Sequence, residues 1–211
     1  MEENIIISLY QNTNFEARDL ANIHLGSLFS NDKFSRKYLE YRMKYVDSLE
    51  GAIIVVAFNP NNKLLGLVYG GPEGYKNKMN QVLTPKIVKT VALRPYLITN
   101  KAIAYKITSK IKSISKRQKG NEISSNIDIE NSLPRPILRL TGIVIDPHLR
   151  SKGVGSKLLN EFVNQAKNHN YNSIILNTPL ENTAAIRFYE RHAWKNLGEL
   201  EEGKNYFSLE L

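Results

Sequence analysis

A short loop in this sequence has the residue types needed to bind an anion. Residues 138–145 are mostly apolar, and after Asp146 and Pro147 the chain reaches two glycines separated by one residue, Gly153 and Gly155. Glycines let backbone N–H groups approach a ligand closely, and the first turn of a helix presents unpaired N–H groups and a positive dipole. The expected phosphate-binding residues are Arg150, Ser151, Lys152, Gly153, Val154, Gly155 and Ser156, with the two basic side chains adding positive charge.

A helix is expected directly after this loop. Its apolar residues share one face at a periodicity of 3.6, namely Val154, Leu158, Leu159, Phe162, Val163 and Ala166. Two nucleotide-binding motifs are excluded for the loop. A dinucleotide fingerprint requires a third glycine where Leu158 stands, and a P-loop requires Gly-Lys-Ser/Thr where the order is Gly155-Ser156-Lys157. The pattern that remains is Arg-x-x-Gly-x-Gly.

The segments after the helix carry a family resemblance. A β-branched run, residues 173–178, predicts a strand, and it is followed by Asn182-Thr183-Ala184-Ala185 and a helix that ends in Phe188-Tyr189. This order of strand, Arg-x-x-Gly-x-Gly, helix, strand, Asn-x-x-Ala and aromatic pair resembles the GNAT N-acetyltransferase family. The chain departs from the family pattern in Ser151, where a glycine is usual, and in Ala193-Trp194, where Gly-Phe is usual.

The resemblance implies an α/β fold with a mixed, mostly antiparallel central sheet flanked by helices. It also implies acetyl-coenzyme A as co-substrate, with its pyrophosphate on the loop. In the family the preceding strand pairs through its backbone with the pantetheine arm, which here means Ile143, Val144 and Ile145. The same resemblance places Tyr189 beside the coenzyme sulfur as the acid that protonates the departing thiolate. Asn182 would bind the pantetheine amides or cap the helix.

The group that deprotonates the amine cannot be assigned from the sequence. Some relatives place a glutamate on the strand before the loop, whereas this strand offers Arg139, Thr141 and Gly142. The remaining candidates are Glu73, Asp146, His148 and Glu181, none of which is favoured over the others.

Neither a metal nor a covalent intermediate on cysteine is expected. The chain has no cysteine, which excludes disulfides, cysteine-bound zinc and a cysteinyl acyl-enzyme, so direct transfer is the simpler mechanism. His24, His169 and His192 are expected to be ordinary surface or edge residues, because no two histidines stand at metal-ligand spacing.

Length and composition favour one acetyltransferase-like domain over residues 1–211. With 211 residues, 42% of them apolar, the chain can bury one sizeable core. The first four residues lack the basic start and apolar core of a signal peptide, and no apolar run approaches the roughly 20 residues of a membrane span. The sequence therefore predicts a cytoplasmic protein.

Positive charge is concentrated in one segment. Net charge is +9, and no acidic residue occurs between Glu73 and Glu122. We expect residues 75–136 to form a basic helical insertion before the phosphate-loop strand, with a helix opening at Thr84-Pro85, a helix over 103–114 and a polar loop over 117–136. The basic residues between Glu73 and Glu122 are Lys76, Lys78, Lys86, Lys89, Arg94, Lys101, Lys106, Lys110, Lys112, Lys116, Arg117 and Lys119.

Three roles for this insertion remain open. It could be a solvated lid, a binding surface for an anionic substrate such as a nucleotide-linked amino sugar, or a contact with an anionic membrane surface. Nucleic acid is not expected as a partner, because no recognised binding module is present. The alternating strand at the C-terminus leaves a homodimer open.

The sequence thus predicts an N-acetyltransferase that moves an acetyl group from acetyl-coenzyme A directly to a primary amine of a small, anionic acceptor. One alternative is a protein lysine or N-terminal acetyltransferase. A second alternative is a non-catalytic protein that binds acyl-coenzyme A or a membrane surface.

Overall fold

The computed structural model describes residues 4–27, 33–93 and 132–211. The chain divides into two compact units, one made of residues 1–76 and 133–211 and the other of residues 77–132. Of the predicted insertion, the helix over 103–114 and most of the polar loop over 117–136 lie outside the described residues. None of the helices in the described ranges is long and apolar enough to cross a membrane.

The larger unit is built on a seven-stranded sheet in the order β1-β2-β3-β4-β5-β7-β6. Neighbouring strands are antiparallel except β4 and β5, which are parallel. The predicted mixed, mostly antiparallel sheet flanked by helices is therefore confirmed. The strands are β1 (Ile6–Leu9), β2 (Ile53–Phe58), β3 (Leu64–Pro72), β4 (Ile137–Ile145), β5 (Ser173–Pro179), β6 (Lys195–Glu201) and β7 (Lys204–Glu210).

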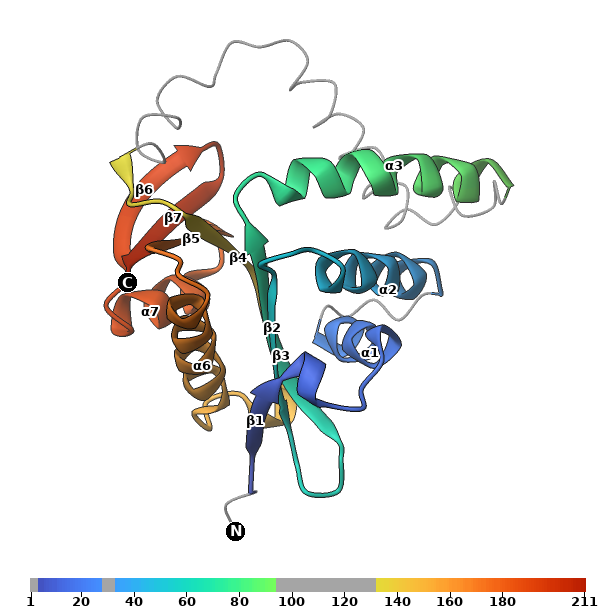
Figure 1. Cartoon of the computed structure of the whole chain (residues 1–211), viewed down its shortest axis with the longest axis horizontal. Coiled ribbons are helices and arrows are strands. Elements are labelled where there is room, and N and C mark those ends of the chain that lie inside the picture. The colour runs from blue at the N-terminus through green and yellow to red at the C-terminus, as the bar shows by residue number, and fades with distance from the viewer. Residues whose placement is uncertain (1–3, 28–32, 94–131) are drawn as a thin grey trace. The chain divides into compact units, whose positions relative to one another are not determined.

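Helices cover both faces of this sheet (Figure 1). The helices α1 (Ala17–Ser27) and α2 (Lys33–Asp47) lie on one face, and α6 (Val154–Asn168) lies on the other. The helix α7 (Thr183–Arg191) shares a hydrophobic cluster with α6. The amphipathic pattern of residues 154–166 explains α6, because its apolar stripe is the part that is buried.

One helix boundary differs from the prediction. The helix expected to open at Thr84-Pro85 instead begins nine residues earlier, as α3 (Tyr75–Leu93), and continues through Pro85. Tyr75, Met79 and Leu83 are buried and stand four residues apart, so they form one stripe that extends the helix towards its N-terminus. A proline inside a helix removes one backbone hydrogen bond, and burial of this stripe offsets that loss.

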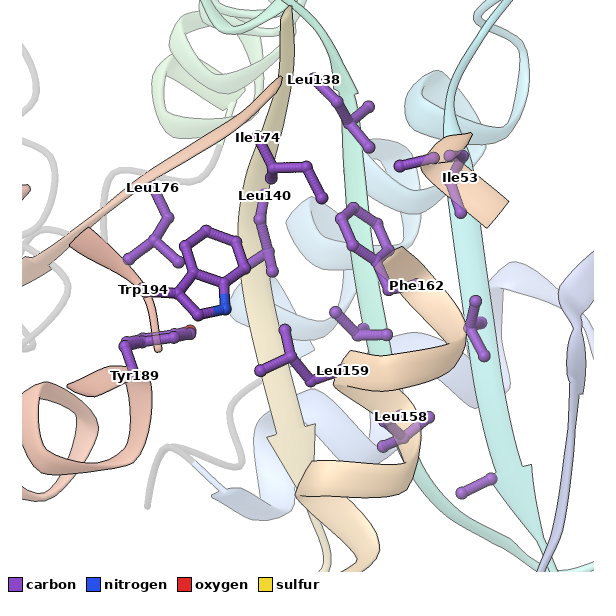
Figure 2. Packing of buried hydrophobic residues seen from close by; sticks show 14 of the residues in the cluster. Ile53, Leu138, Leu140, Leu158, Leu159, Phe162, Ile174, Leu176, Tyr189 and Trp194 are labelled. Carbon is purple, nitrogen blue, oxygen red and sulfur yellow. The ribbon is translucent and has the colours of Figure 1, made fainter. Parts of the chain in front are cut away.

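The main hydrophobic core lies between the sheet and the helices α6 and α7 (Figure 2). Leucines of β4 and α6 meet the Phe162 ring there, while Trp194 and Tyr189 extend the same cluster towards β5. Each fully buried side chain of this size contributes about 1.5–3 kcal/mol relative to exposure. The residues labelled in Figure 2 are Ile53, Leu138, Leu140, Leu158, Leu159, Phe162, Ile174, Leu176, Tyr189 and Trp194.

The strand β4 contains a bulge that changes which of its residues face the core. Tyr69 of β3 is opposite Gly142 and Gly70 is opposite Leu140, so Thr141 is the extra residue on β4. Before the bulge Leu140 packs in the main core, and after it Ile143 does so. Bulges bend and twist the strand that carries them.

The strands β4 and β5 are paired only over a short distance. Residues 137–139 of β4 pair with residues 173–175 of β5, and within the described part of the sheet β5 then pairs only with β7. The stretch 140–144 of β4 therefore has β3 on one side and no strand partner on the other. The phosphate-binding loop predicted from the sequence begins at the end of this stretch.

Candidate functional site

The loop after β4 reverses the chain through a single helical turn followed by two residues in the left-handed conformation. The carboxylate of Asp146 accepts a hydrogen bond from the His148 N–H at 3.0 Å and caps a single turn, Pro147–Leu149. Leu149 is buried and anchors that turn in the core. Ser151 and Gly153 then adopt left-handed backbone conformations, with φ of 62° and 77°. These two residues direct the chain into α6.

The first turn of α6 begins before the helix's own backbone hydrogen bonds start. Lys157 donates the first hydrogen bond of the helix, to the Gly153 carbonyl at 3.1 Å, so the N–H groups of residues 154–156 precede the intrahelical ladder. A Cβ atom at Gly153 would meet nothing within 4 Å, which leaves its surroundings open. Arg150, at the start of this loop, is exposed. The predicted loop residues are therefore together at one end of α6, as an anion site requires.

Gly155 serves a different purpose from Gly153. A Cβ atom there would lie 2.9 Å from Cδ1 of Ile145 and 3.4 Å from Cε2 of Phe188. The missing side chain lets α6 approach both the end of β4 and the helix α7. The sequence pattern could not separate these two roles, because both glycines fit the same motif.

Ser156, in the first turn of α6, is bound to a histidine that sequence reasoning did not assign to the site. Nε2 of His192 lies 2.9 Å from the Ser156 hydroxyl, and Nδ1 lies 2.7 Å from the Phe188 carbonyl oxygen. Because a carbonyl only accepts, Nδ1 donates, and in the neutral ring Nε2 accepts from the hydroxyl of Ser156. The two residues are 36 positions apart, so no local spacing could have indicated this contact.

Tyr189 lies among aromatic rings at the end of α7. Its ring centroid is 5.3 Å from that of Phe188, 5.5 Å from that of Trp194 and 5.6 Å from that of Phe207. Figure 2 shows the Tyr189 ring beside Trp194. Burial raises the pKa of the Tyr189 phenol above its usual 10, so the group stays protonated at neutral pH. The side chain therefore belongs to the core.

Asn182 is the N-cap of α7. Its side-chain oxygen accepts a hydrogen bond from the Ala185 N–H at 3.2 Å. Of the two roles expected from the sequence, the capping role is thus realised. The residue is exposed, and the cap uses only the oxygen of its amide group.

A group of basic and tyrosine side chains lies on the face of β4 that is opposite to α6. The Arg42 guanidinium of α2 lies over the Tyr69 ring, 5.4 Å from its centroid. Tyr75 and Thr141 share a hydrogen bond between their hydroxyls. Burial, followed by the charges of Arg139, Arg42 and Lys204, lowers the pKa of Lys76 to about 7. We call Arg42, Lys76 and Arg139 the basic cluster.

His24 was expected at the surface or an edge, and that prediction is wrong. It is buried in α1, with Nε2 3.2 Å from the Tyr69 hydroxyl. Ala17, Leu20, Ala21 and His24 stand at the i, i+3, i+4 and i+7 positions of one helix face, a signal that would have placed the histidine inside. Burial, followed by the charge of Arg42, lowers its pKa to about 4. His169 is exposed, as expected.

The four candidate bases are in different surroundings. The Glu73 carboxylate forms an ion pair with Arg135, and the Asp146 carboxylate is used by the turn before α6. His148 and Glu181 are exposed. Within the described ranges, no three residues of the types that ligate metals come together.

A family model describes part of this chain. Residues 118–194 match the acetyltransferase (GNAT) family, a range that includes the loop, α6, β5 and α7. The comparison with curated proteins finds no match.

Solved structures share the fold over the full length of the chain. A protein of Pyrococcus horikoshii superposes with a TM-score of 0.58 at 14% identity, covering 99% of both chains. A GNAT-family acetyltransferase of Staphylococcus aureus gives 0.55 at 15% identity, over 98% of this chain and 99% of that one. The PaiA N-acetyltransferase of Thermoplasma acidophilum, solved in complex with coenzyme A, gives 0.53 at 12% identity over 99% of both chains.

Proposed function

We propose that the chain is an acetyltransferase of the GNAT family, whose model matches residues 118–194, and from this premise we propose which residues hold its donor and what it acts on. In this proposal it is an enzyme that uses acetyl-coenzyme A for acyl transfer. The acceptor we propose is a primary amine on a small molecule that carries a negative charge. The observation on which the proposal rests is the separation of β4 from β5 directly before the open loop at the start of α6.

The pyrophosphate of the donor binds at the first turn of α6. The N–H groups of residues 154–156 and the helix dipole favour an anion, and Arg150 and Lys152 supply charge beside it. Ser151 and Gly153 support this role through their left-handed conformations, which turn the backbone into the helix.

The pantetheine arm lies along β4 in the manner of an added strand. Ile143, Val144 and Ile145 provide its backbone partners, because β5 has already left this side of β4. Asn182 stands at the start of α7, where its amide N–H₂ can donate to the arm while its oxygen caps the helix.

Tyr189 completes the transfer as the proton donor. The amine nitrogen attacks the thioester carbonyl carbon, so that a C–N bond forms as the C–S bond breaks. A backbone N–H of β4 polarises that carbonyl. The leaving sulfur takes the phenolic proton, and the proton lost by the amine restores the tyrosine through water. The products are an N-acetyl amine and the free thiol of coenzyme A.

Titration of acetyl-coenzyme A into the protein tests the donor site. We expect micromolar binding that weakens at least about tenfold in Arg150→Ala/Lys152→Ala, since each charge-assisted contact is worth about 1.5–3 kcal/mol. The matched control is Arg18→Ala, which removes an exposed arginine on α1. Equal affinity in the wild type and the double variant would place the pyrophosphate elsewhere.

A screen for release of the coenzyme thiol then separates the remaining functions. Turnover with small anionic amines supports the proposal, whereas turnover only with peptides would make the enzyme a protein lysine or N-terminal acetyltransferase. Binding of acetyl-coenzyme A without turnover on any amine would indicate a non-catalytic member of the family.

A further inference from the structure

The bulge in β4 has both of its residues on one face of the sheet. Leu140 before the bulge and Ile143 after it pack in the main core beside α6. The two residues between them, Thr141 and Gly142, therefore have their side-chain positions on the opposite face, where α1 contacts β4. On that face each of the two bulge residues meets a tyrosine, and the two tyrosines come from different elements.

The first tyrosine, Tyr69 of β3, lies across Gly142. A Cβ atom at Gly142 would stand 2.9 Å from Cε1 and 3.1 Å from the hydroxyl oxygen of Tyr69. A glycine inside a strand commonly marks a place where another group approaches the backbone closely, and here that group is the phenol ring. Tyr69 is also the residue opposite Gly142 in the pairing of β3 with β4, directly before the register shifts.

The Tyr69 ring is held in this place by two charged or polar side chains. Its hydroxyl lies 3.2 Å from Nε2 of His24 in α1, and the Arg42 guanidinium of α2 lies over the ring, 5.4 Å from its centroid. Both Tyr69 and His24 are buried. An apolar pair would fill this space without the cost of burying polar groups, so packing alone does not account for the arrangement.

The second tyrosine, Tyr75 at the start of α3, is bound to Thr141. The two hydroxyl groups share a hydrogen bond, and Tyr75 is buried. Its ring also lies against β3, because a Cβ atom at Gly71 would stand 3.1 Å from Cδ1 of Tyr75. Thr141 is thus connected to the adjacent strand through α3. We call Tyr69 and Tyr75 the tyrosine clamp.

The backbone N–H of Ile143, directly after the bulge, points away from β3. The Asp146 N–H donates to the Leu65 carbonyl beside β3 at 2.9 Å. Alternate residues of a strand direct their N–H groups to the same side, so the Val144 N–H also faces β3 and the Ile143 N–H faces the other edge. That edge is the one that β5 has already left.

The bulge decides that Ile143 has this orientation. The Glu73 N–H donates to the Ile137 carbonyl at 3.1 Å, so Ile137 and every second residue after it face β3, while Leu140 faces the side of β5. Continued without a bulge, this alternation would bring Gly142 to the open edge. The extra residue moves that position to Ile143, whose side chain is anchored in the main core.

We propose that the tyrosine clamp positions the Ile143 N–H so that it polarises the thioester carbonyl of the donor. This inference rests on the proposed acetyltransferase function and adds two positioning residues that act through the backbone of β4. The carbonyl oxygen gains negative charge as the C–N bond forms, so the hydrogen bond from the Ile143 N–H strengthens in the transition state. Loosening the clamp therefore slows the chemical step more than it weakens donor binding.

Infrared spectroscopy of bound acetyl-coenzyme A, labelled with ¹³C at the acetyl carbonyl, tests the clamp without an acceptor. Polarisation lowers the stretching frequency of that carbonyl. We expect a lower frequency in the wild-type complex than in the free donor, and loss of most of this shift in Tyr75→Phe and in Tyr69→Phe. The matched control is Tyr171→Phe, which also removes a buried tyrosine's hydrogen bond, to the Gly51 carbonyl, and should keep the wild-type frequency.

A double-mutant cycle between Tyr75 and Thr141 adds a kinetic readout. Tyr75→Phe and Thr141→Val remove the same hydrogen bond from its two ends, so the double variant should lose no more activity than either single variant. With an amine that supports thiol release, we expect each variant to lower kcat about tenfold, less than the loss of a whole oxyanion donor, and to leave the KM for acetyl-coenzyme A within about twofold. Thr141→Val also serves if a tyrosine variant does not fold.

The outcomes separate the clamp from the proposed function. A frequency shift that the clamp variants lose supports the clamp even if no amine is acetylated, in which case only the transfer function fails. Equal frequencies in the wild type, Tyr75→Phe and Tyr69→Phe, or equal losses of kcat in Tyr75→Phe and Tyr171→Phe, would overturn the clamp while the acetyltransferase function stands. If acetyl-coenzyme A does not bind to the wild type, the proposed function is overturned and the clamp with it.

Discussion

The imidazole of His192 lies 2.9 Å from the hydroxyl of Ser156 and thereby fastens the end of α7 to the first turn of α6. Its other nitrogen donates to the Phe188 carbonyl, so the ring is fixed at both ends. Tyr189 follows Phe188 directly. The helix that carries the proposed acid is thus tied to the turn proposed to hold the pyrophosphate.

Replacing His192 should therefore weaken donor binding more than it slows the chemical step. We expect His192→Ala to raise the KM for acetyl-coenzyme A about three- to tenfold, the effect of one lost hydrogen bond, with a smaller change in kcat. Steady-state kinetics at saturating amine measure both quantities. The control is His169→Ala, which changes an exposed histidine. An unchanged KM in His192→Ala would show that the contact between His192 and Ser156 does not affect donor binding.

Replacing Tyr189 should have the opposite effect, lowering kcat more than it weakens donor binding. Tyr189→Phe keeps the ring contacts with Trp194 and Phe207 and removes only the proton donor, so kcat should fall about 10²- to 10⁴-fold with little change in coenzyme affinity. Rapid-mixing or steady-state assays of thiol release, together with calorimetry, measure the two effects.

Tyr171→Phe provides a contrasting control for this prediction. The Tyr171 hydroxyl donates to the Gly51 carbonyl at 2.7 Å, so its loss should cost about 1 kcal/mol of stability and leave kcat unchanged. If Tyr189→Phe retained wild-type turnover, the phenol would have no part in proton transfer.

A methyl group at Gly155 should destabilise the fold. Its Cβ would stand 2.9 Å from Ile145, and forcing that contact should cost about 1–3 kcal/mol in the free energy of unfolding. Gly26→Ala is a matched control, because Gly26 is helical and its Cβ would meet nothing within 4 Å, so this change should stabilise by up to about 1 kcal/mol. Urea denaturation measures the free energy of unfolding of both variants. Equal changes in the two would mean that the packing of α6 does not depend on the close approach of Gly155 to Ile145.

His24 should make stability depend on pH in the weakly acidic range. Its pKa is lowered from 6.5 to about 4 in the folded protein, so between these values the unfolded chain binds more protons than the native one. The contribution of His24 is complete above pH 6.5 and is lost progressively as pH falls to 4, by about 3 kcal/mol in total. Comparing urea denaturation at pH 7 and pH 5 for the wild type and His24→Gln should show a smaller difference in the variant.

The sequence predicted most of the fold because the elements of this chain carry local signals. The stripe from Val154 to Ala166 marks α6, and the alternating residues after Trp194 mark the β6–β7 hairpin. The loop could likewise be located, because the spacing of Gly153 and Gly155 is a local property. The start of α3 was placed wrongly because Thr84-Pro85 resembles a helix start, whereas burial of Tyr75, Met79 and Leu83 decides the boundary.

The parts of the site that escaped prediction depend on contacts between distant residues. Arg42 meets Tyr69 across 27 positions of sequence, and Tyr75 meets Thr141 across 66, so no window of neighbouring residues could indicate the basic cluster. The lowered pKa of Lys76 is also invisible in a sequence, because it arises from burial and from charges on other elements. Sequence pattern thus indicated the proposed donor loop, while tertiary structure was needed to find the basic cluster.

The bulge in β4 can be removed, in principle, without turning any side chain to the wrong face. Leu138 and Leu140 before it, and Ile143 and Ile145 after it, all pack in the main core, and excising Thr141 would leave these four at strictly alternating positions. A deletion there would therefore keep the hydrophobic pattern and produce a straighter strand. The hydrophobic pattern alone therefore does not require Thr141, which follows by two positions the last β4 residue that is paired with β5.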